Sequence, residues 1–74
     1  MPTDQSPTQV VSGEIRACMA RGQRTQGELA AVLGLSQPSV SSRLKGDVAW
    51  DVDELAKVAS WLDVPLAELI ASAA

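Results

Sequence analysis

Histidine, phenylalanine and tyrosine are absent from this 74-residue sequence, and cysteine occurs once, at Cys18. A lone cysteine cannot form an internal disulfide, and without histidine too few soft ligands remain for a structural zinc site. No apolar run approaches the roughly 20 residues that span a bilayer, and no charged leader precedes an apolar stretch. We therefore expect a cytoplasmic protein with no membrane partner, no metal and no cofactor.

Aromatic content is low, yet 46% of the residues are hydrophobic. Trp50 and Trp61 are the only aromatic residues, so leucine, valine, isoleucine and alanine must fill the core. Such a composition favours short helices packed together, and a chain of this length allows one compact core but not two domains. We predict a flexible N-terminal arm over residues 1–6, followed by a single domain over residues 7–74.

Charges are unevenly distributed along the chain, whose formal net charge is −3. Between Arg16 and Gly46 five cations stand against Glu28 alone, whereas outside that window eight carboxylates stand against Lys57 alone. This distribution suits a molecule with one anion-binding face, although cations on solvated helix surfaces would give the same counts. Charge alone therefore leaves both interpretations open.

Start signals for helices recur along the sequence, each with a short oxygen-bearing side chain placed to accept hydrogen bonds from first-turn amides. Because glycines can end helices, Gly34 and Gly46 are predicted stops. The pattern predicts an all-α fold of five helices: about residues 7–22, the segment from the Thr25 cap to Gly34, the segment from the Ser36 cap to Gly46, the segment from the Asp51 cap to the Asp63-Val64 turn, and a last helix opened by Pro65.

The second and third predicted helices meet at a three-residue turn, the spacing of a helix-turn-helix. Gly34 permits the sharp reversal between them. At about 100° per residue, Val40 and Leu44 of the third helix point inward. The outer side is polar and slender, which suits the major groove of DNA, where glutamine pairs with adenine and serine contacts several bases. We therefore assign base reading to Gln37, Pro38, Ser41 and Ser42.

At these residues the sequence resembles the Cro/repressor-type, or XRE-like, family of phage and bacterial transcription regulators. The resemblance is carried by T-Q-G-E-L-A-A-V-L-G-L-S-Q over residues 25–37, V-S-S-R-L-K-G over residues 40–46, and D-E-L-A-K-V-A-S-W-L-D-V-P-L-A-E-L-I over residues 53–70. It implies a compact, lambda-repressor-like five-helix domain that binds operator DNA as a dimer and reads it with the third helix. Gln26 and Gln37 match family positions that touch DNA, whereas Arg43 stands where the family usually has an apolar residue.

Several polar residues around this motif are candidates for phosphate contacts. A helix amino terminus offers free amides beside Gln26, so that side chain is well placed for the DNA backbone, although it also suits an ordinary first helical turn. Arg16 and Arg21 are more simply explained as solvated, and Cys18 as a packing residue. The phosphate candidates are Arg24, Gln26, Ser39, Arg43 and Lys45.

The last two predicted helices carry the candidates for dimerisation. Helical projection places Trp61 away from the inward stripe of its helix, so we expect a partly exposed indole that either anchors an interface or covers the small core. The final short helix has more apolar surface than such a core can bury. The dimerisation candidates are Trp61, Leu66, Leu69 and Ile70.

The sequence does not indicate an enzyme, because it has no histidine base, no nucleophile–base pair and no phosphate-cradling glycine loop. It also offers no evident site for a small-molecule substrate. We expect a sequence-specific regulator that binds double-stranded DNA as a homodimer on a near-palindromic operator. The alternative is a protein-interaction module of the same fold, such as an antitoxin or an antirepressor, which the net acidity favours.

Overall fold

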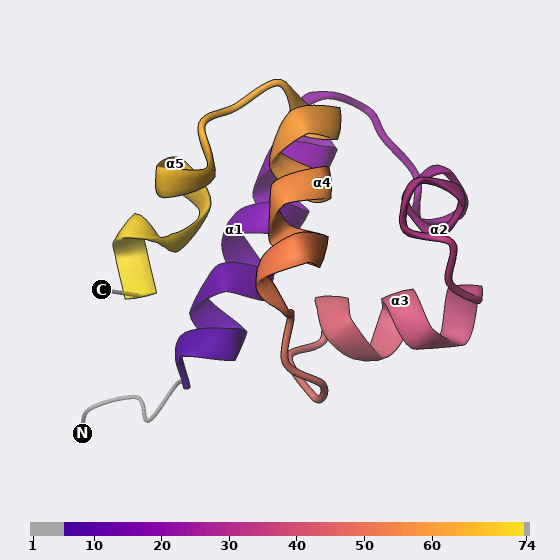
Figure 1. Ribbon diagram of the computed structural model, residues 1–74, viewed down its shortest axis with the longest axis horizontal. Coiled ribbons are helices and arrows are strands. Elements are labelled where there is room, and N and C mark those ends of the chain that lie inside the picture. Colours follow the sequence, from indigo (N-terminus) through magenta and orange to yellow (C-terminus); the bar gives the residue numbers. More distant parts are fainter. Residues whose placement is uncertain (1–5, 74) are drawn as a thin grey trace.

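The structure, a computed structural model, describes residues 6–73. In this part of the chain there are five α-helices and no strand, which confirms the predicted all-helical class. The predicted arm over residues 1–6 lies outside the described residues except for Ser6. The elements are α1 (Pro7–Arg21), α2 (Gln26–Leu33), α3 (Gln37–Leu44), α4 (Val52–Leu62), α5 (Leu66–Ile70) and a 3-10 helix, η1 (Ala71–Ala73) (Figure 1).

The helices begin where local hydrogen bonding dictates. Ser6, Thr25 and Asp51 each accept a hydrogen bond from the amide three residues on, and the side chain at that position bonds back to the cap, which completes three capping boxes. Ser36 accepts from the amide of Ser39 and caps α3. Pro65 precedes α5 without a side-chain cap. The side-chain N-caps predicted at Thr25, Ser36 and Asp51 are thereby confirmed.

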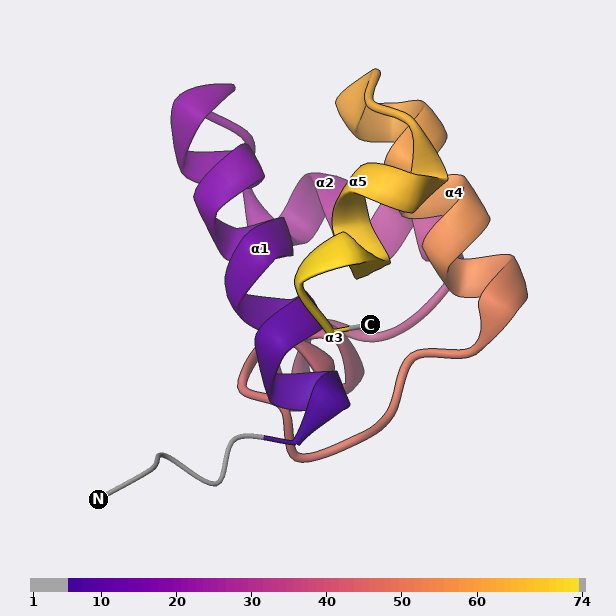
Figure 2. The same cartoon turned by 90° about the vertical axis from the view of Figure 1, so that its left-hand side faces the viewer.

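α1 and α4 form the centre of the molecule and separate two groups of elements (Figure 1). α2 packs against α3 and α4, and α3 also packs against α1. On the other side, α5 and η1 pack against α1, and α5 also contacts α4. The view turned by 90° shows α5 beside α1 and α4, with α3 behind them (Figure 2). The candidate DNA-reading helix and the candidate dimerisation helix therefore lie on different sides of the domain.

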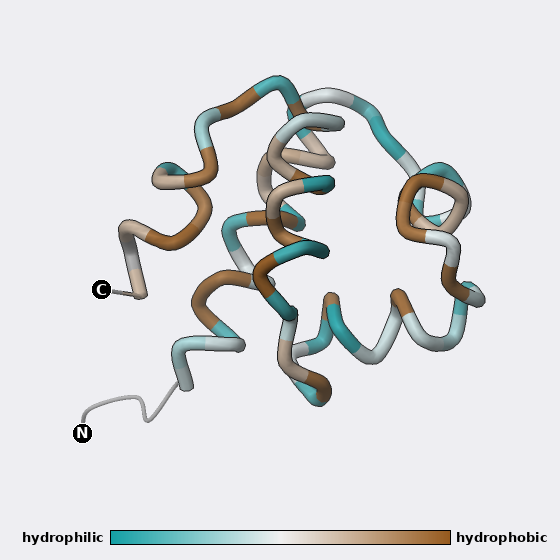
Figure 3. The backbone as a smooth tube through the Cα atoms, viewed as in Figure 1, coloured by the Kyte–Doolittle hydropathy of each residue, from teal (hydrophilic) through white to brown (hydrophobic). Residues whose placement is uncertain are grey.

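Aliphatic side chains from all five helices fill the core, as the composition predicts. The most deeply buried are Ile15, Leu29, Val40, Val58 and Leu69. Along α3 most of the backbone is coloured hydrophilic to neutral, which fits a helix that buries only Val40 and Leu44 (Figure 3). Across the described residues, none of the helices combines the length and the apolar character needed to cross a membrane.

Candidate nucleic-acid interface

The connection between α2 and α3 fixes how the two helices cross. Gly34 adopts a left-handed conformation with a φ of 68°. The amide of Leu35 then donates to the carbonyl of Ala30 at 3.0 Å, which closes the end of α2. Two residues after the glycine, Ser36 caps α3. The chain therefore reverses within three residues, and α3 lies across the view while α2 is seen end-on (Figure 1).

The first turns of α2 and α3 lie next to each other. A Cβ atom built on Gly27 would be 3.5 Å from Nε2 of Gln37, so the side chain of Gln37 lies directly over the first turn of α2. Gln26 and Gln37 are both exposed. A Cβ at Gly27 would make only an ordinary contact at this distance, so the approach does not depend on the glycine. Gln37 therefore lies beside Gly27, the residue that follows Gln26, and both glutamines are exposed at these adjoining first turns.

The remaining candidates on α3 line its outer side. Pro38 is exposed, and Ser39, Ser41 and Ser42 are half-buried. The hydroxyl of Ser39 lies 3.0 Å from that of Ser36 and belongs to the cap of the helix. Val40 and Leu44 are buried, as the projection predicted. The four base-reading candidates Gln37, Pro38, Ser41 and Ser42, here called the α3 strip, are all at least partly exposed, whereas Val40 and Leu44 of the same helix are anchored in the core.

Two cations border a hollow beside this strip, at the amino end of α2. The hollow has a volume of about 240 Å³ and is lined by Arg16, Met19, Ala20, Arg24, Gln26 and Leu44. The guanidinium carbon of Arg24 lies 5.1 Å from the ring centroid of Trp61, a cation–π contact that holds the side chain in place. Lys45 is exposed at the carboxyl end of α3. The charged part of the candidate phosphate surface thus comes from Arg16, Arg24 and Lys45.

Arg43, a predicted phosphate contact, is held in an ion pair within the chain. Its Nε donates to Oε1 of Glu54 at 3.1 Å, and its Nη1 donates to the carbonyl of Ser39. Only 18% of the Arg43 side chain and 15% of the Glu54 side chain are exposed. The edge of α3 that carries Arg43 faces the first turn of α4, where Glu54 neutralises the charge.

Two side chains of α1 hold the carboxyl end of α3, and sequence reasoning missed both. Ser12 donates to the carbonyl of Arg43, and Arg16 donates to the carbonyl of Leu44. The last carbonyls of a helix have no partner in its regular hydrogen-bond pattern. Arg16 supplies a partner for the Leu44 carbonyl, and Ser12 adds a second bond to the Arg43 carbonyl, which also accepts from the amide of Gly46. Ser12 also accepts a hydrogen bond from Nε1 of Trp50 at 2.9 Å. A serine among the apolar positions of the first helix was the available signal.

A comparison with protein families bears on this helical framework. The model of the BetR domain family matches residues 9–74. The chain belongs to the BetR domain family. Searches of curated proteins and of solved structures gave no match.

Local ion pairs reduce the positive charge that this BetR domain presents. Arg21 pairs with Glu14 at 3.7 Å, so two of the five cations between residues 16 and 46 face internal carboxylates. The pKa of Glu28 is lowered because its carboxylate accepts hydrogen bonds from Thr25, with a smaller effect from the charge of Arg24. The carboxylate of Glu28 is therefore charged at neutral pH, and in the same window Arg16, Arg24 and Lys45 have no carboxylate in salt-bridge contact.

On the other side of the BetR domain, α5 corrects one prediction. Leu69 is 0% exposed and belongs to the core, so it is not available to a second subunit. It is buried because it faces α1 and α4, whereas the next residue points outward. Ile70 is 41% exposed, and Leu66 is half-buried against the core.

Ile70 also borders an apolar hollow of this domain. The hollow has a volume of about 350 Å³ and is lined by Pro7, Thr8, Val11, Trp50, Leu55, Ile70 and Ala73. Trp61 is not among these lining residues. It is half-buried, and Arg24 covers one of its faces. Trp61 and Ile70, which the sequence grouped as dimerisation candidates, therefore do not line the same hollow.

Proposed function

We propose that this protein is a sequence-specific regulator of transcription that binds double-stranded DNA in the cytoplasm, as a phage or bacterial repressor of the Cro type does. One observation carries the proposal: Gln26 and Gln37 are both exposed, and they belong to the adjoining first turns of α2 and α3. Neither side chain fills the core or caps a helix. A surface with two amide side chains and a slender polar helix suits hydrogen bonds to the edges of base pairs in the major groove.

Gln37 is the principal base-reading residue in this proposal. Its amide has a donor and an acceptor side by side, which matches the N6 and N7 atoms of adenine in the major groove. Ser41 is one turn further along the same strip and offers a hydroxyl to more than one kind of base. Because Val40 and Leu44 are anchored in the core, the strip presents these groups in a fixed direction.

Phosphate contacts come from the hollow at the amino end of α2. Gln26 and the free first-turn amides of α2 face the same region as Arg24, which is held against Trp61. With Arg16 and Lys45 the surface carries three cations. Since each neutralised phosphate contributes about −0.9 to the slope of log affinity against log salt, we expect a slope of roughly −3 per subunit. Binding by one subunit is therefore weak.

A symmetric dimer overcomes this weakness, and we propose that it forms through the side of the molecule that carries α5. Ile70 is exposed there beside the apolar hollow that Trp50 and Leu55 help to line. Two-fold symmetry would place the reading helices in successive major grooves, about 34 Å apart, on a near-palindrome with half-sites roughly 10 base pairs apart.

Fluorescence anisotropy with DNA from upstream of the gene tests the proposal, with unrelated DNA of the same length as competitor. Gln37→Ala should weaken specific binding by about 1–3 kcal/mol and leave non-specific binding nearly unchanged, because it removes a base contact. Gln26→Ala should weaken both alike. Lys45→Ala should flatten the salt dependence by about one unit, whereas the matched control Lys57→Ala on α4 should not.

Equal loss on specific and unrelated DNA for Gln37→Ala would contradict base reading. Absence of binding to any DNA at low salt would favour the second candidate, a protein-interaction module such as an antitoxin or an antirepressor. The net charge of −3 and the internal pairing of Arg21 and Arg43 favour that candidate. A co-purifying protein that protects α3 from hydrogen exchange would then support it.

A further inference from the structure

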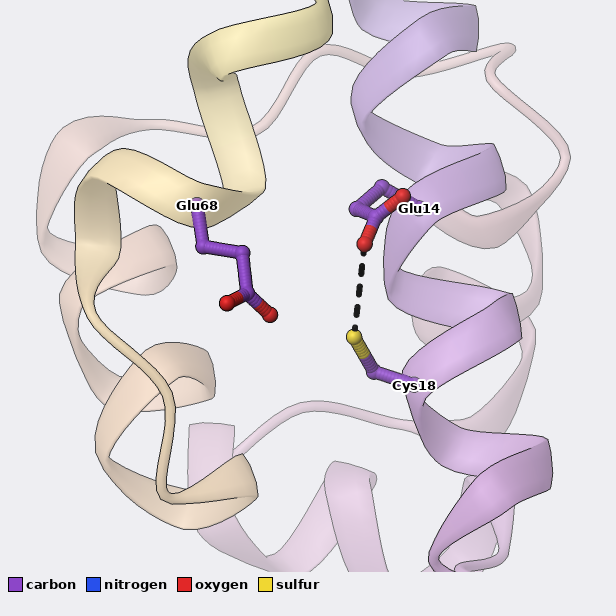
Figure 4. A group of neighbouring side chains, drawn as sticks. All are labelled: Glu14, Cys18 and Glu68. Atoms are coloured by element: carbon purple, nitrogen blue, oxygen red, sulfur yellow. Dashed lines mark hydrogen bonds between the residues drawn. The ribbon is translucent and has the colours of Figure 1, made fainter.

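Three potential metal ligands from two helices converge at the contact between α1 and α5. Glu14 and Cys18 belong to α1, and Glu68 belongs to α5 (Figure 4). One ligand atom from each residue lies within 4.8 Å of the others. Cys18 is 7% exposed, so its thiol is held by packing and faces both carboxylates. The three groups come from different parts of the sequence and meet only in the folded chain.

The spacing of these atoms suits a tetrahedral cation. In a zinc site with a Zn–S bond near 2.3 Å and a Zn–O bond near 2.1 Å, a sulfur and an oxygen ligand are about 3.6 Å apart. The Sγ atom of Cys18 lies 3.7 Å from Oε2 of Glu14. Because the two residues are four apart on one helix, the backbone of α1 fixes this separation. The exposed side chain of Glu68 needs only a small movement to close the set.

A cation already occupies the edge of this cluster. The Nη2 atom of Arg21 lies 3.2 Å from Sγ of Cys18 and 3.7 Å from Oε2 of Glu14. The Arg21 side chain is 65% exposed, so it is free to move into solvent. Its position shows that the potential around the thiol and the carboxylate attracts positive charge. A compact divalent ion would reach all three ligand atoms, which a planar guanidinium on a long side chain does not.

We propose that Glu14, Cys18 and Glu68 form a three-ligand site for a thiophilic divalent cation, with Zn²⁺ as the reference ion and water as the fourth ligand. On binding, the metal–sulfur bond forms while the thiol releases its proton to solvent, and Arg21 leaves the cluster. Thiolate and carboxylate ligands are both common for zinc. The bound ion would clamp α5, a five-residue helix without a side-chain cap, to the middle of α1.

Thermal unfolding of the full chain, stripped with a chelator and then titrated with Zn²⁺, tests this site. At a hundredfold excess over the dissociation constant, the melting temperature should rise by about 10–20 °C. Glu68→Gln should lose most of this rise, and its basal stability should change little because the side chain is exposed. Arg21→Gln should bind Zn²⁺ more tightly than the natural chain, since the competing cation is gone.

Asp53→Asn on α4 is the matched control, because it removes an exposed carboxylate from a helix that contributes no ligand to the cluster. It should leave the Zn²⁺ response unchanged. With Co²⁺ as a probe, the natural chain should show thiolate-to-metal charge-transfer absorption in the near ultraviolet, and Cys18→Ala should show none. The proposal is overturned if Zn²⁺ gives no stabilisation, or if Cys18→Ala and Glu68→Gln respond as the natural chain does, since ordinary acidic surface would then account for binding.

Discussion

We expect removal of the Ser12 hydroxyl to lower the stability of the domain. Ser12 is fully buried on α1, donates to the carbonyl of Arg43 at the end of α3 and accepts from Nε1 of Trp50. In Ser12→Ala the indole N–H of Trp50 loses its partner, whereas the Arg43 carbonyl keeps the hydrogen bond from the amide of Gly46. The cost is therefore that of one orphaned donor.

An unsatisfied buried donor costs about 1–3 kcal/mol. Because Trp50 is half-buried, we take the lower end of this range, about 1 kcal/mol; at about 4–8 °C per kcal/mol for a domain of this size, Ser12→Ala should lower the melting temperature by about 4–8 °C. Far-ultraviolet circular dichroism during heating and urea titration measures both quantities. Ser60→Ala, an exposed serine on α4, is the matched control and should stay within about 0.5 kcal/mol of the natural chain.

A double-mutant cycle separates the hydrogen bond from general packing. Trp50→Phe removes the N–H donor, so Ser12→Ala should cost less in that background, with a coupling energy of about 0.5–3 kcal/mol. An equal loss in both backgrounds would refute the reasoning. A Ser12→Ala chain as stable as Ser60→Ala would refute it as well.

Four further outcomes are expected. Gly34→Ala should cost about 1 kcal/mol in urea unfolding because φ is positive there, whereas Gly13→Ala within α1 should gain about 0.5–1 kcal/mol; equal signs would contradict the assigned backbone conformations. The pKa of Glu28 is lowered, so its contribution to stability is complete above the unfolded pKa and is lost as the pH falls through the folded pKa; Glu28→Gln should remove this part of the acid-unfolding profile. Arg43→Gln should lower the midpoint of thermal unfolding but leave the salt slope of DNA binding unchanged, and a slope reduced by about one unit would return Arg43 to the phosphate surface. Ile70→Glu should yield monomers in light scattering with helicity intact, and a persistent dimer would place the interface elsewhere.

The features that were predictable from sequence are those that depend on a few neighbouring residues. Thr25 and Glu28 are three apart, so their capping box forms wherever a helix begins there, and Gly34 ends α2 by its own backbone freedom. Helical periodicity likewise gave the inward direction of Val40 and Leu44 on α3.

What the sequence did not predict depends on how the helices pack. Arg43 and Glu54 are on different helices, and their pairing requires the edge of α3 to face the start of α4. Leu69 and Ile70 are adjacent and both apolar, so only the placement of α5 against α1 decides which one is buried. The role of Ser12 could not be predicted for the same reason, because its hydroxyl donates to the carbonyl of Arg43, which is 31 residues away in the sequence.

The environments of the two tryptophans give the protein two optical reporters. With no tyrosine in the chain, intrinsic fluorescence excited in the near ultraviolet comes from Trp50 and Trp61 alone. The emission of Trp50 depends on its hydrogen bond to Ser12, which links α1 to the end of α3. The emission of Trp61 depends on whether the Arg24 guanidinium lies over its ring. In a Trp50→Phe background, emission from Trp61 therefore follows Arg24 by itself. A phosphate that draws Arg24 away would change that emission without any label.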